Sequence, residues 1–196
     1  PEIMEDCGRK GVRRVVVESG GFTEFGEEGR ALAARVKAAA ARWGIRFIGP
    51  NGLGVINRPL GLATSFGILD PSVPAGGISV LSQSGGVMLS ILNTLTSEGL
   101  GVAKLVSMGN KLDVDENDLL EYLIEDPETH IICLYLEGIS DGRRLMELAR
   151  QTDKPILLHK ANIGSAAGRV AASHTAALAA DDRVVDAALR QVGIAR

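Results

Sequence analysis

One of the three histidines, His174, lies in a run of small residues near the end of the chain. Residues 172–179 read ASHTAALA, so an imidazole there is reachable by a substrate. A neutral imidazole is a nucleophile when one ring nitrogen is free and an acceptor holds the proton on the other. A lone histidine is more often structural, but these small neighbours offer no core to pack against. Together with the anion-binding turn described next, this setting predicts that His174 carries a phosphoryl group.

A serine- and glycine-rich turn at residues 82–86, SQSGG, is the second chemical feature. It follows a short apolar strand and opens an apolar helix. A helix N-terminus presents free backbone N–H groups and roughly half a unit of positive charge to an anion. The predicted phosphate-binding residues are Ser82, Gln83, Ser84 and Gly85. The alternative is an ordinary turn in which serine only caps the helix.

Glu137 is the carboxylate best placed to hold the proton of His174. It directly follows an apolar strand that is expected to end at residue 136. A carboxylate acceptor fixes the tautomer of an imidazole and raises its basicity. We therefore predict His174 and Glu137 as the catalytic pair.

A serine hydrolase is a rival interpretation of the same residues. The pattern around Ser84 differs by one residue from the G-x-S-x-G turn of hydrolases. Two candidate acids, Asp113 and Asp153, follow Ser84, and His174 comes last, which is the chain order of that superfamily. The missing first glycine and the missing glycine run for an oxyanion hole disfavour this interpretation.

Alternating strands and helices must position these residues. Apolar runs and helical periodicity predict strands over 12–18, 46–48, 77–81, 102–107, 130–136 and 155–159, and helices over 27–43, 85–97, 115–124, 141–150 and 181–192. This alternation predicts an α/β fold with a parallel sheet covered on both faces. Ligands bind beyond the carboxyl ends of such strands, where the candidate residues lie. Prolines over 57–76 predict an irregular connection between two units.

The composition limits the class of protein and its partners. Hydrophobic residues are 45% and charged residues 23% of the 196, which excludes disordered and membrane classes. A net charge of −3 without a basic cluster predicts no nucleic-acid partner. No apolar run approaches the roughly 20 residues that span a bilayer, so we expect no membrane partner. Cys7 and Cys133 are isolated, which predicts reduced thiols in a cytoplasmic protein.

No metal site is predicted. The acidic stretch 113–118 fails as a calcium loop, because its sixth position is Asp118 where glycine is required. Asp115 with Asp118 instead resembles a pair that caps a helix. No set of cysteines and histidines has the spacing of a zinc site.

Five motifs, taken together and in order, resemble the NDP-forming acyl-CoA synthetases. They are GPNGLGVIN at 49–57, LSQSG at 81–85, SMGN at 107–110 with DVD at 113–115, YLEG at 135–138 and SHT at 173–175. The motifs cover nearly the whole chain. No one of them would be specific, but five in register are.

The resemblance implies two domains and their sites. Residues 1–70 would be the C-terminal part of a CoA-binding Rossmann-like domain, and residues 75–196 a flavodoxin-like ligase domain. Three residues, Ser19, Gly20 and Asn51, would lie at the CoA edge. The family reaction interconverts an acid, CoA and ATP with an acyl-CoA, ADP and phosphate, through an acyl phosphate and a phosphohistidine. By this match, the phosphoryl carrier is the histidine and the orienting carboxylate is the glutamate predicted above.

The resemblance also implies partners outside this chain. An ATP-grasp domain or subunit would bind ATP or ADP with Mg, and a small carboxylic acid would be the substrate, in an enzyme expected to be oligomeric. The chain begins at Pro1 and lacks the first Rossmann strand with its CoA loop, so we expect a piece that is inactive alone. The alternative is a non-catalytic CoA-sensing module of a regulatory enzyme such as a protein acetyltransferase.

Overall fold

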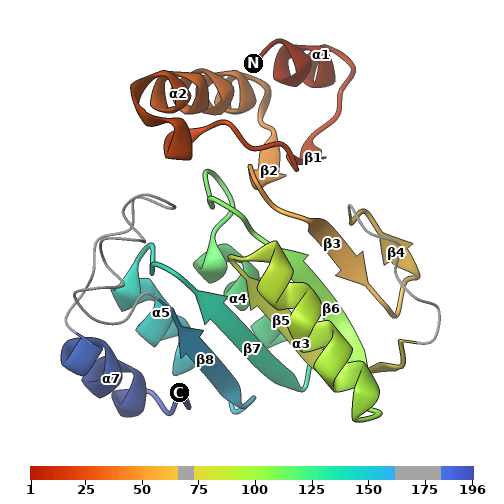
Figure 1. Cartoon of the computed structure of the whole chain (residues 1–196), viewed down its shortest axis with the longest axis vertical. Helices are drawn as coiled ribbons and strands as arrows, with labels where there is room; N and C mark the ends of the chain where they lie inside the picture. The colour runs from red at the N-terminus through yellow and green to blue at the C-terminus, as the bar shows by residue number, and fades with distance from the viewer. Residues whose placement is uncertain (66–72, 162–181) are drawn as a thin grey trace.

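Two β-sheets divide the structure into two α/β units, which lie one above the other in Figure 1. This computed structural model describes residues 1–65, 73–161 and 182–196. Within those ranges, no helix has the length and apolar character needed to cross a membrane.

The N-terminal unit packs two helices on a two-stranded sheet. Its elements are α1 (Glu2–Arg9), β1 (Arg14–Val16), the 3-10 helix η1 (Thr23–Phe25), α2 (Gly26–Trp43) and β2 (Arg46–Ile48). The two strands are parallel, and α2 forms the crossover between them. The buried face of α2, at Ala33 and Val36, packs in one cluster with Phe47. α2 ends at Gly44, whose φ of 62° favours glycine.

Six strands form the larger sheet, in the order β4-β3-β6-β5-β7-β8. Their bounds are Gly54–Asn57 for β3, Leu62–Ala63 for β4, Ala75–Ser82 for β5, Val102–Ser107 for β6, Ile131–Leu136 for β7 and Ile156–Lys160 for β8. β5, β6, β7 and β8 are parallel, whereas β3 pairs antiparallel with both β6 and β4. Every residue of β6 is buried, as expected for a strand covered on both faces.

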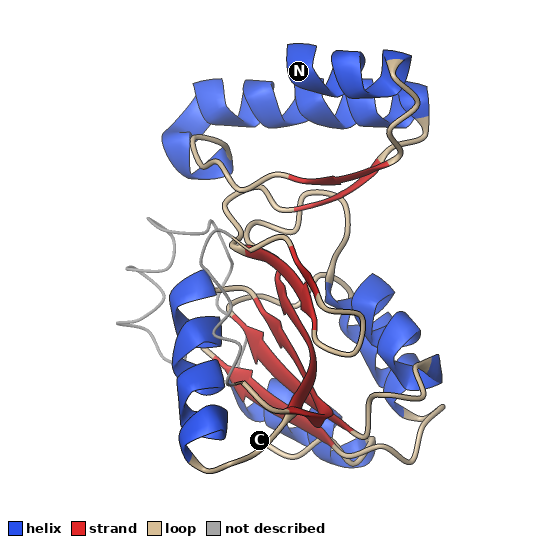
Figure 2. Ribbon diagram, turned by 90° about the vertical axis from the view of Figure 1, so that its right-hand side faces the viewer, coloured by secondary structure: helices blue, strands red, loops and turns tan. Residues whose placement is uncertain are grey.

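Helices lie on both sides of this sheet (Figure 2). They are α3 (Gly85–Ser97), α4 (Glu116–Glu125), α5 (Gly142–Ala149) and α7 (Asp182–Gln191). Successive residues of a strand point to opposite faces. Accordingly, Val80 packs in one cluster with Met88 of α3, whereas Leu81 packs in another with Leu120 of α4 and Leu145 of α5. The sheet therefore has a buried core on each face.

The predicted α/β fold class with a mainly parallel sheet is confirmed, and most element bounds agree within one or two residues. One difference concerns β3 and β4, for which the sequence predicts no strands. They form strands because β3 pairs with β6, from Gly54↔Ser107 to Asn57↔Lys104. The division at 1–70 and 75–196 stays a prediction, although the hydrogen-bonded sheets already change between β2 and β3.

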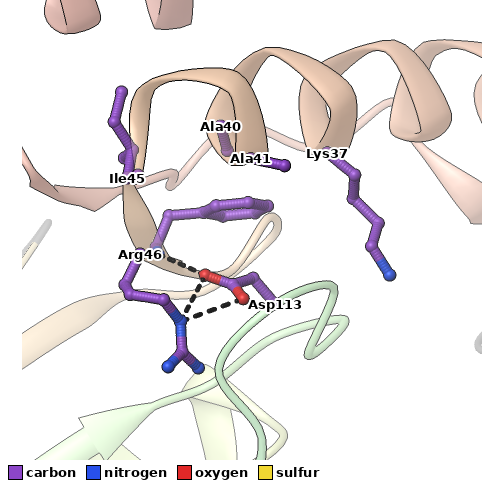
Figure 3. A pocket seen from close by; sticks show the side chains of 8 residues that line it. Lys37, Ala40, Ala41, Ile45, Arg46 and Asp113 are labelled. Carbon is purple, nitrogen blue, oxygen red and sulfur yellow. Dashed lines mark hydrogen bonds and ion pairs between the residues drawn. The ribbon is translucent and has the colours of Figure 1, made fainter.

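The segment 110–114 joins the two units. The N–H groups of residues 110, 112 and 114 donate to the carbonyls of residues 50, 49 and 47, at 2.8, 3.0 and 3.1 Å respectively. The segment therefore lies along β2 as a further antiparallel strand would. Between these bonds, the Asp113 carboxylate accepts from the Phe47 N–H at 2.7 Å and from Arg46 Nε at 3.1 Å (Figure 3). The loop after β6 is therefore fixed to both units.

Candidate functional site

A cleft of about 290 Å³ opens where the turns after β5, β6 and β7 meet the N-terminal unit. Its lining residues are Asn51, Leu53, Gln83, Ser84, Gly85, Gly86, Gly109, Asn110 and Glu137. The structure thus brings together candidate residues from three separate motifs. The cleft lies beyond the carboxyl ends of the parallel strands, where α/β sheets bind ligands.

The N-terminus of α3 forms one wall of the cleft. Ser84 is its N-cap, and its Oγ accepts from the Val87 N–H at 3.4 Å. Gly85 must be glycine here, because a Cβ at this position would lie 2.3 Å from Leu53 Cγ. At the neighbouring Gly86 an added Cβ would meet nothing within 4 Å. This wall has the free amides and the helix dipole that hold an anion.

Ser82 lies behind this wall and is fully buried. Its Oγ donates to the Ser84 carbonyl at 2.6 Å and accepts from the Ser84 N–H at 3.2 Å. Ser82 therefore shapes the turn through hydrogen bonds to its backbone. Its direct contact with phosphate stays a prediction.

Gln83 links the turn after β5 to the turn after β7. Its Oε1 accepts from the N–H of Glu137 at 2.9 Å and from that of Gly138 at 3.2 Å. Glu137 consequently lies in the same cleft as the N-terminus of α3. Burial and, to a smaller extent, the charge of Glu137 raise the pKa of nearby Tyr135 above its usual 10.0.

The predicted CoA-edge residues also lie together. The Asn51 N–H donates to the Ser19 carbonyl at 3.0 Å, and a Cβ at Gly20 would lie 3.4 Å from Asn51 Oδ1. Beside them, Glu24 accepts from Asn110 Nδ2 at 2.7 Å. Burial opposes the ionisation of Glu24, but its hydrogen bonds outweigh burial and lower its pKa. Because Asn51 also lines the cleft, the predicted CoA edge and the N-terminus of α3 border the same cavity.

His174 lies outside the described residues. Both acids of the rival hydrolase interpretation are described, and neither lines the cleft that contains Ser84. Asp113 is held by Arg46 (Figure 3), and Asp153 lies with His130 beside a pocket at the amino ends of β7 and β8. Neither aspartate of the hydrolase interpretation therefore lies in the cleft of Ser84.

A second cavity, of about 310 Å³, lies under the C-terminal end of α2, as Figure 3 shows. Lys37, Ala40 and Ala41 of α2 line it, together with Arg46 and Asp113. Because Arg46 begins β2, this cavity lies at the amino end of that strand, where α/β sheets do not normally bind ligands. None of the predicted site residues lines it.

Four residues of the cleft, Leu53, Gly86, Gly109 and Asn110, were not predicted individually. The residue type is the sequence signal at Gly109. Its φ of 57° and the close approach of the Pro50 carbonyl exclude a side chain, so this position requires glycine. Among the described residues, the non-glycines with positive φ are Asn51 and Lys111, and both flank this site. Such strained conformations concentrate at functional sites. The described residues hold no group of three His, Cys, Asp or Glu side chains that could bind a metal.

Comparison with known proteins identifies the family. The family model described as "Succinyl-CoA ligase like flavodoxin domain" matches residues 75–196. The whole chain is 40% identical to "Acetate--CoA ligase [ADP-forming] I subunit alpha" of Pyrococcus furiosus, of which it covers 42%. It is also 40% identical to "Acetate--CoA ligase [ADP-forming]" of Methanocaldococcus jannaschii, of which it covers 27%. The chain thus spans less than half the length of these curated relatives.

A solved structure agrees with these relatives. It is a "dinucleotide forming Acetyl-coenzyme A synthetase 1" of Ca. Korarchaeum cryptofilum "in complex with phosphate and ADP". Its TM-score is 0.91 at 35% identity, over 99% of this chain and 42% of that chain. These findings do not support the alternative of a regulatory CoA-sensing module. The chain belongs to the NDP-forming acyl-CoA synthetases, the family that its motifs resemble.

Proposed function

We propose that this chain supplies the CoA edge and the phosphohistidine of an NDP-forming acyl-CoA synthetase. In the direction of ATP synthesis, phosphate attacks the acyl-CoA carbonyl and CoA leaves, which gives an acyl phosphate. The imidazole of His174 then attacks the phosphorus of the acyl phosphate, and the carboxylate leaves as the free acid. From His174 the phosphoryl group passes to ADP on an ATP-grasp domain or subunit. The observation that carries the proposal is the single cleft shared by Asn51, the N-terminus of α3 and Glu137.

The residues of the cleft have separate tasks in this proposal. The amides at Gly85 and Gly86 hold phosphate and the phosphoryl group at the end of the helix dipole. Glu137 accepts a hydrogen bond from the N–H of the His174 ring. The other ring nitrogen then carries no proton and is free to attack phosphorus. Asn51, beside Ser19 and Gly20, brings the thioester end of CoA to the phosphate. The proposed pair of Glu137 and His174 thus works next to a fixed anion site.

The substrates and partners follow from the relatives. A solved relative holds phosphate and ADP, which supports phosphate and ADP or ATP as ligands of the complete enzyme, and the names of the curated relatives support CoA. We propose that Mg accompanies the nucleotide. The acid is a small carboxylate, and acetate is the acid in the names of the two curated relatives described above. We propose that the complete enzyme is an oligomer in the cytoplasm and carries an ATP-grasp part as a fused domain or a separate subunit.

The division of labour predicts that this chain alone has no synthetase turnover. No nucleotide-binding loop occurs in its sequence, so phosphoryl transfer to ADP requires the ATP-grasp part. CoA-thioester formation should be measured with ATP, CoA, Mg and several acids, for the chain alone and for the complete enzyme as a matched control. Thioester formation by the chain alone would refute the proposal.

The anion site predicts that Gly86→Asp weakens phosphate binding by about tenfold, or roughly 1.4 kcal/mol. A side chain at Gly86 has open space around it, so the variant should fold while adding a negative charge beside the bound anion. Gly86→Asn has the same shape without the charge and is the matched control. Phosphate affinity is measured by titration calorimetry on the complete enzyme. Equal affinities for the two variants would contradict an anion site at this helix end.

A further inference from the structure

The backbone of the two-residue turn Glu137–Gly138 is bound by side chains on all sides. Both of its N–H groups donate to Gln83 Oε1. The Glu137 carbonyl accepts from Lys160 Nζ at 2.8 Å, and the Gly138 carbonyl accepts from Lys111 Nζ at 2.7 Å. All four backbone polar groups of the turn therefore have a side-chain partner.

These three side chains come from three neighbouring parts of the sheet. Gln83 follows β5, Lys111 follows β6, and Lys160 is the last residue of β8. In the sheet order, β5 and β8 are the two neighbours of β7, and β6 is the next strand beyond β5. The turn that carries Glu137 is consequently fixed from both sides of its own strand.

The side chains of both lysines are buried, which is unusual for a lysine. The side chain of Lys111 is 7% exposed and pairs with Glu116, which is fully buried, at 2.7 Å. Lys160 is 8% exposed, and its Nζ also donates to the Ala161 carbonyl at 2.7 Å. Taking an ammonium group out of water is costly unless several hydrogen bonds compensate. Lys111 also adopts a φ of 52°, which lysine rarely does.

The orientation of the Gln83 amide is fixed by the same contacts. Two backbone donors face one end of the amide, so that end must be the oxygen. An apolar side chain of similar size would leave the two N–H groups without this acceptor. Gln83 is half-buried and lines the cleft, so water can reach the region if the side chain is changed.

We infer that Gln83, Lys111 and Lys160 are positioning residues for Glu137. They hold the backbone on both sides of its Cα, so that the carboxylate keeps one place relative to the N-terminus of α3. This inference rests on the proposed role of Glu137 in phosphoryl transfer to His174. In this inference Gln83 does not contact the phosphoryl group and affects its transfer only by holding Glu137 in place.

The test uses Gln83→Leu in the complete enzyme, because removal of either buried lysine also disturbs the core. Formation of the phosphoenzyme from labelled ATP should slow by about tenfold, the lower end of the loss typical for residues that orient a catalytic ligand. In the direction of ATP synthesis, where phosphate is a substrate, the KM for phosphate should change by less than about twofold, since the amides of α3 remain. Gln151→Leu, the same substitution in an exposed residue after α5, is the matched control and should have no effect.

A double-mutant cycle with Glu137→Gln decides how Gln83 acts. If Gln83 acts through Glu137, adding Gln83→Leu to Glu137→Gln should slow phosphoenzyme formation by less than about twofold further. A full additional loss, or a rise in the KM for phosphate with an unchanged rate, would overturn the inference. Slow transfer in Glu137→Gln with normal transfer in Gln83→Leu would overturn it as well, while leaving the proposed function intact. An unchanged rate in Glu137→Gln would instead overturn the role of Glu137, and the inference with it.

Gln83→Glu keeps the test decisive if the leucine variant does not fold. Its carboxylate can accept from the same two N–H groups, so the turn stays fixed. We expect phosphoenzyme formation at saturating substrate within about threefold of the unmodified enzyme. The KM for phosphate should rise, because the new charge lies in the anion cleft. A loss of rate as large as that of Glu137→Gln would overturn the inference.

Discussion

Replacing His174 with alanine is expected to abolish phosphoenzyme formation in the complete enzyme. Labelled ATP should give the unmodified enzyme an acid-labile, base-stable label, which is the signature of a phosphoramidate. Without the imidazole there is no nitrogen to accept the phosphoryl group, so no label should form. The label is measured after gel filtration, with and without acid treatment. Undiminished label in His174→Ala would end the assignment.

Two further variants separate the roles of the site residues. Ser84→Ala should weaken labelling without eliminating it, because it removes only the cap of α3, worth about 1 kcal/mol. Glu137→Gln should slow labelling by about tenfold or more, because the imidazole loses its charged acceptor. The hydrolase interpretation predicts the opposite pattern, with Ser84→Ala fatal and no label on histidine. The matched control is His159→Ala, which removes an exposed imidazole that stacks on Tyr135.

Lys111→Met is expected to lower the free energy of unfolding by about 3–5 kcal/mol, the cost of breaking a buried ion pair from one side. The variant leaves the Glu116 carboxylate fully buried without its counter-charge. Glu116 still accepts from the N–H of Ser140 at 2.5 Å and from its Oγ at 3.1 Å, but neither group is charged. Urea unfolding followed by circular dichroism measures the difference.

The double variant Lys111→Met/Glu116→Gln is the control for this prediction. It removes both charges and keeps an acceptor for Ser140, so about half of the lost stability should return. Arg46→Met breaks the ion pairs with Asp113 and Asp118 of an arginine that is 48% exposed. It should cost no more than about 1 kcal/mol, because such exposed pairs are weak. A Lys111→Met variant as stable as Arg46→Met would contradict the buried pair as a source of stability.

The sequence was sufficient for the strands and helices with long periodic patterns, such as α2, α3 and β6. It was not sufficient for β3 and β4, because strands of four and two residues are too short to show a period. Their formation depends on pairing with β6, a contact made about 50 residues later in the chain. No local pattern encodes such a contact, so only the structure places these strands in the larger sheet.

In the candidate site, too, residues that follow a local pattern could be predicted, and residues whose contacts depend on the fold could not. Gln83, Ser84, Gly85 and Glu137 could be found because they directly follow apolar strands, and the topology of parallel sheets brings strand ends together. Lys111 could not be found, because its ammonium reaches Gly138 through a fold-dependent contact between two loops. Asp115 was expected to cap a helix, and its Oδ1 indeed accepts from the N–H groups of Asn117 and Asp118.

The segment after β6 has a mechanical consequence for the enzyme. Asn110 donates to Glu24 in the N-terminal unit, and the next residue, Lys111, donates to the carbonyl beside Glu137 in the larger unit. One peptide bond therefore separates a contact at the proposed CoA edge from a contact at the proposed catalytic turn. A tilt of the N-terminal unit would move both residues together. We expect binding or release of CoA to shift the position of Glu137 through this connection. Thioester cleavage and phosphoryl transfer would then be coupled.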